Sequence, residues 1–462
     1  MMYRRSLRTV AIALVLAVSV AACAGGTTDP DEGTEQTGPE TTGTTGAPET
    51  EGRIDATGAL SIAVFHPFTG VDADHGTTLL SGCLAGIKAV NDAGGVLERE
   101  VVCEPQDIGT SPTEAVPAAN QMLSTVSNLI MTVGPSNFAP PTTPIIGEAG
   151  IVMFAQAGDP LYNTSADPYF WRLTPADDLN GTAMAYWAYN SGITRAVAVF
   201  ADTTEAQTQV PAFKSTYEAL GGELLLELSL TPEQSSYRTE VARLLEAAAE
   251  GVVTELDVQT GSTFWSEVLQ QAGELPRIHT DEYQLSVEWL DPVTEALGAE
   301  NLVDKYTATG PAAPSEGEAI VAFQDGIDSI SDSLIPEPER YREDPFSASG
   351  YDSVIIAALA MTHAGSAEPR VWVESIRDVT GPESDDVTSV STYAEGLQAL
   401  EQGENIVYVG TSGQVVFDEY RSNSGGFTAY RYEPLADEGE RLVVIGDISA
   451  EVLADLRSQL EE

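Results

Sequence analysis

The chain has 462 residues, of which 71 are Asp or Glu and 21 are Lys or Arg, so its formal net charge is −50 at pH 7. Charge of this sign repels phosphate backbones and anionic lipid surfaces, which excludes nucleic acid as a partner. We interpret the acidity as a solvated surface; attraction of a cationic ligand and adaptation to high salt are the alternatives.

The N-terminal segment predicts export. An apolar run over residues 10–22 follows an arginine-rich stretch and ends in small residues. It is shorter than the roughly 20 residues that span a bilayer, which favours a cleaved signal peptide over residues 1–22. The sequence VAAC at 20–23 resembles the bacterial lipobox, which implies that Cys23 is acylated and anchors the chain. An ordinary secretory signal is the alternative, and Arg4-Arg5 is a weak sign of a twin-arginine route.

A tether is expected next, over residues 23–56. Residues 24–53 contain no side chain that is larger and more apolar than alanine or proline. Such a segment cannot bury enough surface to offset chain entropy and stays a flexible linker. About 410 residues remain, which suits two domains.

From Ala59 onward, short apolar runs alternate with amphipathic helices, a pattern typical of a parallel α/β sheet. The first predicted strand leads through a Gly/Asp loop into a helix that stops at Gly94-Gly95. The second helix begins at Ser111, where Pro112 and Glu114 occupy the positions of a first-turn proline and a capping-box acid. The predicted elements of this half are strands at 59–65, 100–104, 128–133 and 151–154 and helices at 76–92, from 111 and near 141–149.

Cys83 and Cys103 are the two cysteines left after Cys23 in an exported chain. Cys83 lies on the apolar face of the helix at 76–92, and Cys103 lies at the end of the next strand. The two meet if that helix packs on the sheet, so we predict a disulfide. Two buried free thiols are the alternative.

The same alternation restarts after Asp177-Asp178 and predicts a second lobe. Residues 331–346 and 381–391 are polar and rich in proline or acid, and we predict surface loops there. The predicted elements of the second lobe are helices at 179–190, 210–220, 237–249, 263–272 and 449–461 and strands at 195–200, 223–228, 251–257 and 277–280.

Ligands of doubly wound sheets bind beyond the carboxyl ends of the strands. This rule predicts a cleft between the two lobes, lined by six loops: residues 68–69, 134–138 and 155–159 from the first lobe and 202–205, 257–261 and 280–283 from the second.

Six stretches between residues 59 and 435 resemble the substrate-binding proteins of branched-chain amino acid ABC importers, the Leu/Ile/Val-binding type of type I periplasmic binding proteins. They are GIKAVNDAGGVLEREVVCEPQDIGTSPTEAV (86–116), VGPSNFAPPTTPIIGEAGIVMF (133–154), YFWRLTPADDLNG (169–181), AFKSTYEALGGEL (212–224), GYDSVIIAALA (350–360) and GTSGQVVFDEYRSNSGGFTAYRY (410–432).

The resemblance implies an α/β fold of two doubly wound parallel-sheet lobes joined by a three-crossover hinge, which closes around a ligand. The crossovers are expected near Thr174, Thr309 and Gly410. Lobe one is then 57–174 with 310–409, and lobe two is 175–309 with 410–462. Trp171-Arg172 resembles the family's aromatic-arginine step before the first crossover, and we interpret it as structural.

The resemblance also implies which residues hold the ligand, and the chain departs from the family at two of them. The family's carboxylate-binding serine position carries Phe138, which leaves Ser136 and Asn137 nearby. The Ala-Thr pair after the 151–154 strand is Ala157-Gly158.

The acid that pairs with a ligand ammonium falls at Glu282, with Asp281 as the competing candidate and a solvated loop acid as the alternative. Positions that usually carry pocket aromatics fall at His75, at Glu205 and near Gly261. Tyr283 and Phe138 either pack against an apolar part of the ligand or belong to the core.

No catalytic pattern occurs: the sequence lacks GxSxG, HExxH, GxxxxGK[ST] and CxxC, so we predict a protein that is not an enzyme and uses no cofactor. The DADH stretch at 72–75 does not build a metal site alone. We predict a monomeric, lipid-anchored extracellular or periplasmic protein that captures a small amino-acid-like or amide-like solute for an ABC permease in the membrane. A ligand sensor that signals to a membrane receptor is the alternative.

Overall fold

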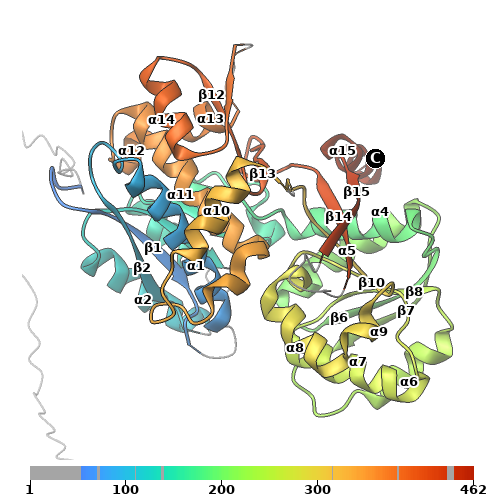
Figure 1. Cartoon of the computed structure of the whole chain (residues 1–462). Helices are drawn as coiled ribbons and strands as arrows, with labels where there is room; N and C mark the ends of the chain where they lie inside the picture. Colours follow the sequence, from blue (N-terminus) through green and yellow to red (C-terminus); the bar gives the residue numbers. More distant parts are fainter. Residues whose placement is uncertain are drawn as a thin grey trace, which may run out of the picture. The chain divides into compact units, whose positions relative to one another are not determined.

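A computed structural model describes residues 54–69, 73–109, 111–136, 140–314, 316–381, 384, 386–433 and 442–461. The predicted signal peptide, Cys23, most of the tether, Asn137 and Phe138 lie outside this part of the chain. No helix within it combines the length and the apolar character needed to cross a bilayer. Two large sheets organise the described residues (Figure 1).

The first sheet is parallel throughout and has the order β2-β1-β3-β4-β5. Alternate residues of β1 enter separate cores, as the two-residue period of a strand requires. Leu60, Ile62 and Val64 pack into one core, and Ala63 and Phe65 into the other. The strands are β1 (Leu60–His66), β2 (Val101–Asp107), β3 (Leu129–Ser136), β4 (Val152–Gln156) and β5 (Phe170–Arg172).

Helices cover both faces of this sheet, and we call the sheet with these helices the first lobe. The helices α1 (Ala73–Asp92), α10 (Glu318–Asp328) and α11 (Pro345–Ala364) contribute to one core. The helices α2 (Pro112–Thr125) and α3 (Thr143–Glu148) contribute to the other. α1 approaches α11 closely, because a Cβ at Gly82 would lie 1.9 Å from the carbonyl oxygen of Ser347.

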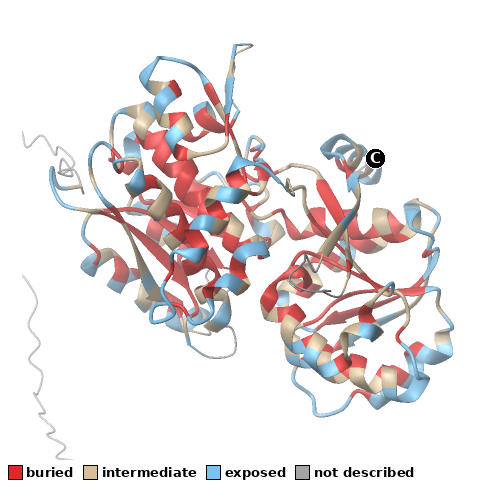
Figure 2. Cartoon of the chain, viewed as in Figure 1, coloured by how far each residue is buried: buried red, intermediate tan, exposed pale blue. Residues whose placement is uncertain are grey.

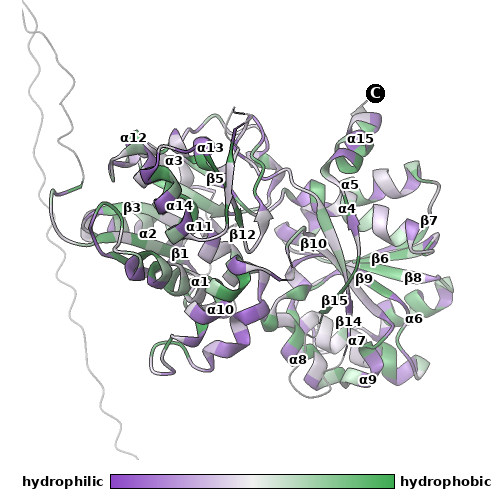
Figure 3. Cartoon of the chain, turned by 45° about the horizontal axis from the view of Figure 1, so that its top comes forward, coloured by the Kyte–Doolittle hydropathy of each residue, from purple (hydrophilic) through white to green (hydrophobic). Residues whose placement is uncertain are grey.

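The second sheet has the order β15-β14-β10-β9-β8-β6-β7. It departs from the predicted parallel sheet at one edge, where β14 and β15 pair antiparallel. Its central strands are buried along their lengths and hydrophobic (Figures 2 and 3). The strands are β6 (Arg195–Ala201), β7 (Glu223–Leu230), β8 (Gly251–Glu255), β9 (Ile278–Thr280), β10 (Tyr306–Pro311), β14 (Phe427–Tyr432) and β15 (Leu442–Ile448).

The helices on the second sheet complete what we call the second lobe. Two of them, α5 and α7, begin earlier than predicted because Thr203 and Asp257 act as N-caps and accept backbone N–H groups of the first turn. The helices are α4 (Asp177–Asn190), α5 (Thr204–Ala219), α6 (Arg238–Ala247), α7 (Val258–Ala272), α8 (Val287–Leu297), α9 (Ala299–Leu302) and α15 (Ala450–Glu461).

The predicted surface loops at 331–346 and 381–391 are wrong in part. The first contains η3 (Pro338–Glu343) and the start of α11, and the second contains β11 (Thr388–Val390). β11 belongs to a small sheet with β12 (Ile406–Gly410) and β13 (Gly413–Gln414). The remaining elements are η1 (Pro160–Tyr162), η2 (Tyr283–Leu285), α12 (Pro369–Trp372), α13 (Ser375–Thr380) and α14 (Tyr393–Glu401).

Local capping also differs at α2. Ser111 is the N-cap and Pro112 opens the helix, but Ser111 forms no side-chain bond to the backbone of the first turn. Its hydroxyl donates to the carboxylate of Glu114 at 3.0 Å instead, so the predicted capping box is not formed.

A disulfide joins Cys83 of α1 to Cys103 of β2, with a Cα–Cα distance of 6.2 Å. It ties the helix to the neighbouring strand where both contribute to one core. The division into lobes at 174, 309 and 410 stays a prediction; β10 itself runs on to Pro311 and pairs there with β14.

Candidate functional site

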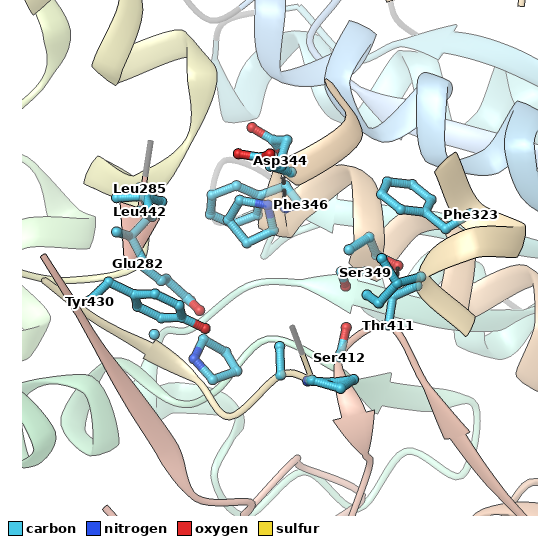
Figure 4. A pocket seen from close by; sticks show the side chains of 18 of the residues that line it. Glu282, Leu285, Phe323, Asp344, Phe346, Ser349, Thr411, Ser412, Tyr430 and Leu442 are labelled. Carbon is cyan, nitrogen blue, oxygen red and sulfur yellow. Dashed lines mark hydrogen bonds between the residues drawn. The ribbon is translucent and has the colours of Figure 1, made fainter. Parts of the chain in front are cut away.

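A pocket of about 190 Å³ lies among residues from both lobes (Figure 4). Its first-lobe wall comes from α10, η3 and the start of α11, and its second-lobe wall comes from η2, β14 and β15. The segments that link the lobes supply the rest, including Thr174, Gly310 and Thr411. Most of the lining is apolar, notably Leu285, Phe323, Phe346 and Leu442.

Glu282 is the one predicted ligand residue, among those described, that lines this pocket. It stands directly before η2, after the end of β9, and is 6% exposed. Burial, reinforced by the charge of Asp281, raises the pKa of Glu282 to about 8, although a hydrogen bond from Asn180 opposes the shift. In Figure 4, Glu282 lies beside Tyr430, across the cavity from Ser349.

A second carboxyl group at the pocket, Asp344, was missed by sequence reasoning. It is fully buried and caps α11 by accepting the N–H groups of Phe346 at 2.9 Å and Ser347 at 3.0 Å. Its other oxygen accepts the N–H of Val287, at the start of α8. Burial raises the pKa of Asp344 to about 6 despite these bonds. Asp344-Pro345 before an apolar run is an N-cap signature that predicts this helix start.

A polar network of the first lobe reaches the pocket through Thr174 and Ser349. Gln156 connects them: it donates to the Ser349 hydroxyl at 2.9 Å and accepts from the Thr174 hydroxyl at 2.6 Å. Ser136, one of the predicted ligand residues, is buried at the end of β3 and pairs in register with Gln156. Ser136 therefore lies one residue behind the pocket wall.

Ala157 and Gly158 do not line the pocket. Their carbonyl groups accept from the buried guanidinium of Arg172 at 3.5 and 3.2 Å. Arg172 also donates to the Ser422 hydroxyl, so it holds the loop after β4 against the third linking segment. The carboxyl group of Asp177 fills the space beside Gly158, 1.7 Å from where a Cβ would lie.

The other predicted ligand residues also lie outside the pocket lining. His75 packs edge-on against Phe346, with ring centroids 4.9 Å apart, and burial lowers its pKa to about 4. Glu205 is half-buried in the first turn of α5. Tyr283 packs against the hydrophobic cores of both lobes, which favours the structural alternative for this residue. Asp281, the competitor of Glu282, is 2% exposed and does not line the pocket.

The pocket combines an apolar cavity with a buried carboxyl group that has no ion pair to a Lys, Arg or His among the described residues. A carboxylate in such surroundings is stabilised by a cation that brings its own N–H donors. The arrangement is therefore suited to a small solute with one positive end and one apolar part.

Comparison with known proteins identifies relatives over most of the chain. The model of the family described as periplasmic binding protein matches residues 59–416. The Leu/Ile/Val-binding protein homolog 3 of Brucella melitensis is 24% identical over 340 residues, which cover 73% of this chain and 87% of the relative.

Solved structures share the fold. A leucine-binding protein LivK from Thermotoga maritima has a TM-score of 0.65 at 19% identity, and the match covers 85% of this chain and 99% of that one. A solute-binding protein of an ABC transporter from Rhodopseudomonas palustris, solved with p-hydroxybenzoic acid, has a TM-score of 0.67 at 16% identity, covering 85% and 97%. The same fold thus holds solutes of different chemistry in these relatives.

Proposed function

Because this chain belongs to the periplasmic binding protein family, we propose that it captures a small amino-acid-like or amide-like solute in the pocket at Glu282 and delivers it to an ABC importer. The names of its relatives support the class of function, since they bind branched-chain amino acids or serve ABC transporters. Because these relatives bind different ligands, the chemical class of this chain's solute has to be inferred from its own pocket.

Glu282 is the residue that supports the proposed binding most directly. Its carboxyl group is buried at the edge of an apolar cavity and costs free energy to ionise there. A ligand ammonium or amide that donates to it removes that cost, because a charge-assisted hydrogen bond is stronger in a buried site. The apolar side chains of Phe346, Phe323 and Leu285 then contact the aliphatic part of the solute.

Export and lipid anchoring belong to the same proposal and rest on the N-terminal sequence. Acylation of Cys23 and the tether that follows would keep the binding lobes near a membrane permease. We expect Cys23→Ser to release the protein into the medium or periplasm, as measured by fractionation of cells. Retention of this variant in the membrane fraction would contradict the anchor.

The test of binding is the thermal stability of the purified chain against aliphatic and aromatic amino acids, amides, amines and small carboxylates. A specific ligand at about 100 times its dissociation constant should add about 2.7 kcal/mol to the free energy of unfolding. The proposal fails if no member of any class raises the melting temperature.

Glu282→Gln should weaken the binding of the ligand so found by roughly 10- to 100-fold, since it removes a hydrogen bond to a charged group worth about 1.5–3 kcal/mol. Titration calorimetry measures this change. Glu246→Gln, an exposed substitution on α6, is the matched control and should bind like the original chain. Equal affinity of the Glu282→Gln variant would show that the ligand does not contact Glu282.

A further inference from the structure

Three more carboxyl groups gather next to Glu282 at the edge of the second sheet. Glu255 ends β8, Asp281 follows β9, and Asp177 opens α4; each is at most 6% exposed. Burial and the charges of Asp281, Glu205 and Asp177 raise the pKa of Glu255 well above its ordinary value. The parallel strands explain this grouping, since their carboxyl ends share one edge of the sheet.

The cluster lacks positive charge from the protein. Within the described residues, none of the four carboxyl groups forms an ion pair with Lys, Arg or His. The positive charge of Arg172 favours the ionised form of Asp177. The N–H groups of Arg172, however, donate to other partners: the carbonyl groups of Ala157, Gly158 and Asp159 and the side chains of Ser422 and Asn163. A buried carboxyl group is stable when it is protonated or paired with a cation, so a cation from outside would allow this cluster to ionise.

Hydrogen-bond donors reach the carboxyl groups of the cluster, but two amide oxygens beside them have none. The Thr208 hydroxyl donates to Asp177 at 2.6 Å, and Asp281 accepts backbone N–H groups. The amide of Gln209 donates to Asp281 at 2.6 Å and to Glu255 at 3.3 Å, so its side chain points into the cluster. Its Oε1 atom has no partner, and neither has Oδ1 of Asn180, whose side chain bonds to Glu282. Both residues are 3% exposed. Buried acceptors without donors are rare in native structures, and here they flank the carboxyl groups.

A single metal ion does not match this arrangement. In the described part of the chain, no three His, Cys, Asp or Glu side chains come close enough together to hold one. The acceptors instead comprise four carboxyl groups and two amide oxygens, of which Glu282 lines the pocket, and such a set suits N–H groups spaced along an organic cation.

We propose that the solute carries at least two cationic N–H groups, one held by Glu282 and a second by Asp281 and Glu255, as in a short aliphatic diamine. This inference rests on the proposed function and names its substrate class. Gln209 and Asn180 accept further N–H groups of the same ligand. Glu282 lines the pocket, so the first cationic group reaches it from there, and the second passes deeper when the lobes move apart.

Calorimetric titration of the purified chain tests the inference with 1,4-diaminobutane, its one-amine analogue butylamine, leucine and calcium chloride. We expect the diamine to bind at least 100-fold more tightly than butylamine or leucine, and calcium to leave its affinity unchanged. Equal binding of leucine and the diamine overturns the inference but leaves the proposed function standing. Competition by calcium at one ion per chain overturns it in favour of a metal site, and absence of binding by any solute class overturns the proposed function itself.

Substitutions of Asp281, Glu255 and Gln209 test whether the cluster binds the second cationic group, independently of Glu282. Asp281→Asn combined with Glu255→Gln should reduce the preference for diamine over butylamine to less than 10-fold, and Glu246→Gln should leave it unchanged. Gln209→Lys supplies a cation to the cluster, so we expect a higher melting temperature without ligand and at least a 100-fold loss of diamine affinity. Retention of diamine binding in a folded Gln209→Lys variant would overturn the inference, even if the double variant fails to fold.

Discussion

The contact between Gly158 and Asp177 shows how one residue type shapes the site. From the resemblance to Leu/Ile/Val-binding proteins, we expect a threonine at position 158. In this chain the residue is glycine, and a carboxyl oxygen of Asp177 lies 1.7 Å from where a Cβ atom of residue 158 would be. The N–H of Asp177 also donates to the Gly158 carbonyl at 2.8 Å. Glycine thus admits a carboxyl group where a side chain would exclude it, and Asp177 joins the acidic cluster as a consequence.

Gly158→Ala should destabilise the chain by about 1–3 kcal/mol, because the new methyl group overlaps the Asp177 carboxyl and forces it to move. Urea unfolding measures the change. Gly381→Ala, at a site with nothing within 4 Å of a Cβ, is the control and should cost far less. Adding Asp177→Ala to Gly158→Ala should recover much of the lost stability, and failure to do so would contradict the overlap.

At the scale of elements, α1 links the parts of the first lobe. It packs closely on α11 at Gly82, and the next residue, Cys83, bonds to Cys103 of β2. The amphipathic pattern of 76–92 predicted which face of this helix is buried. The α11 partner was not predicted, because a helix that is buried nearly all round has no amphipathic period to find.

Reduction of the disulfide should lower the free energy of unfolding by about 3 kcal/mol, because the bond closes a loop of 20 residues in the unfolded chain. Melting temperatures with and without a thiol reductant measure the effect. Cys83→Ser/Cys103→Ser should melt at the reduced temperature under both conditions. If reductant lowers the melting temperature of this double variant as well, the effect does not come from the disulfide.

At the scale of the whole molecule, buried ionisable groups of opposite kinds govern the dependence of stability on pH. Burial lowers the pKa of His75 to about 4 and of His279 to about 3, so these histidines are neutral when folded and take up protons on unfolding below pH 6.5. Burial raises the pKa of Asp177 and Glu282 to about 8, so the folded chain holds protons that the unfolded chain has lost. The two histidines therefore affect stability only below about pH 6.5. The two carboxyl groups continue to lower stability as the pH rises from 6.5 to about 8.

The ligand-free chain should therefore lose about 3 kcal/mol of stability between pH 6.5 and 8, because folded Asp177 and Glu282 keep protons that the unfolded chain has already released. Chemical denaturation at several pH values measures the slope. Asp177→Asn/Glu282→Gln should reduce the slope in this window, and Glu255, whose pKa burial also raises, should keep the remainder. A stability that rises from pH 6.5 to 8 would contradict the assignment of raised pKa values to these two carboxyl groups.

The ligand site was predictable only in part. Glu282 follows a predicted strand at the carboxyl edge of its sheet, so strand position and family resemblance both indicated it. Ser136, Ala157 and Gly158 occupy equivalent strand ends in the first lobe, but none of them lines the pocket. Ser136 pairs with Gln156, which bonds to the lining residue Ser349, and Arg172 binds the carbonyl groups of Ala157 and Gly158. Strand ends identify the edge of a sheet, and side chains from other elements decide which of them reach the cavity.

The α/β alternation, the positions of most strands before residue 280 and the disulfide partners could be predicted from the amino-acid sequence, because these features depend on local periodicity and on neighbours along the chain. The sequence does not reveal that Asp344, Phe346 and Tyr430 line the same pocket as Glu282, or that Asp177, Glu255 and Asp281 share one buried cluster. These groups come from loops and strand ends that are far apart in the sequence. Their proximity is set by the packing of sheets and helices rather than by any local pattern.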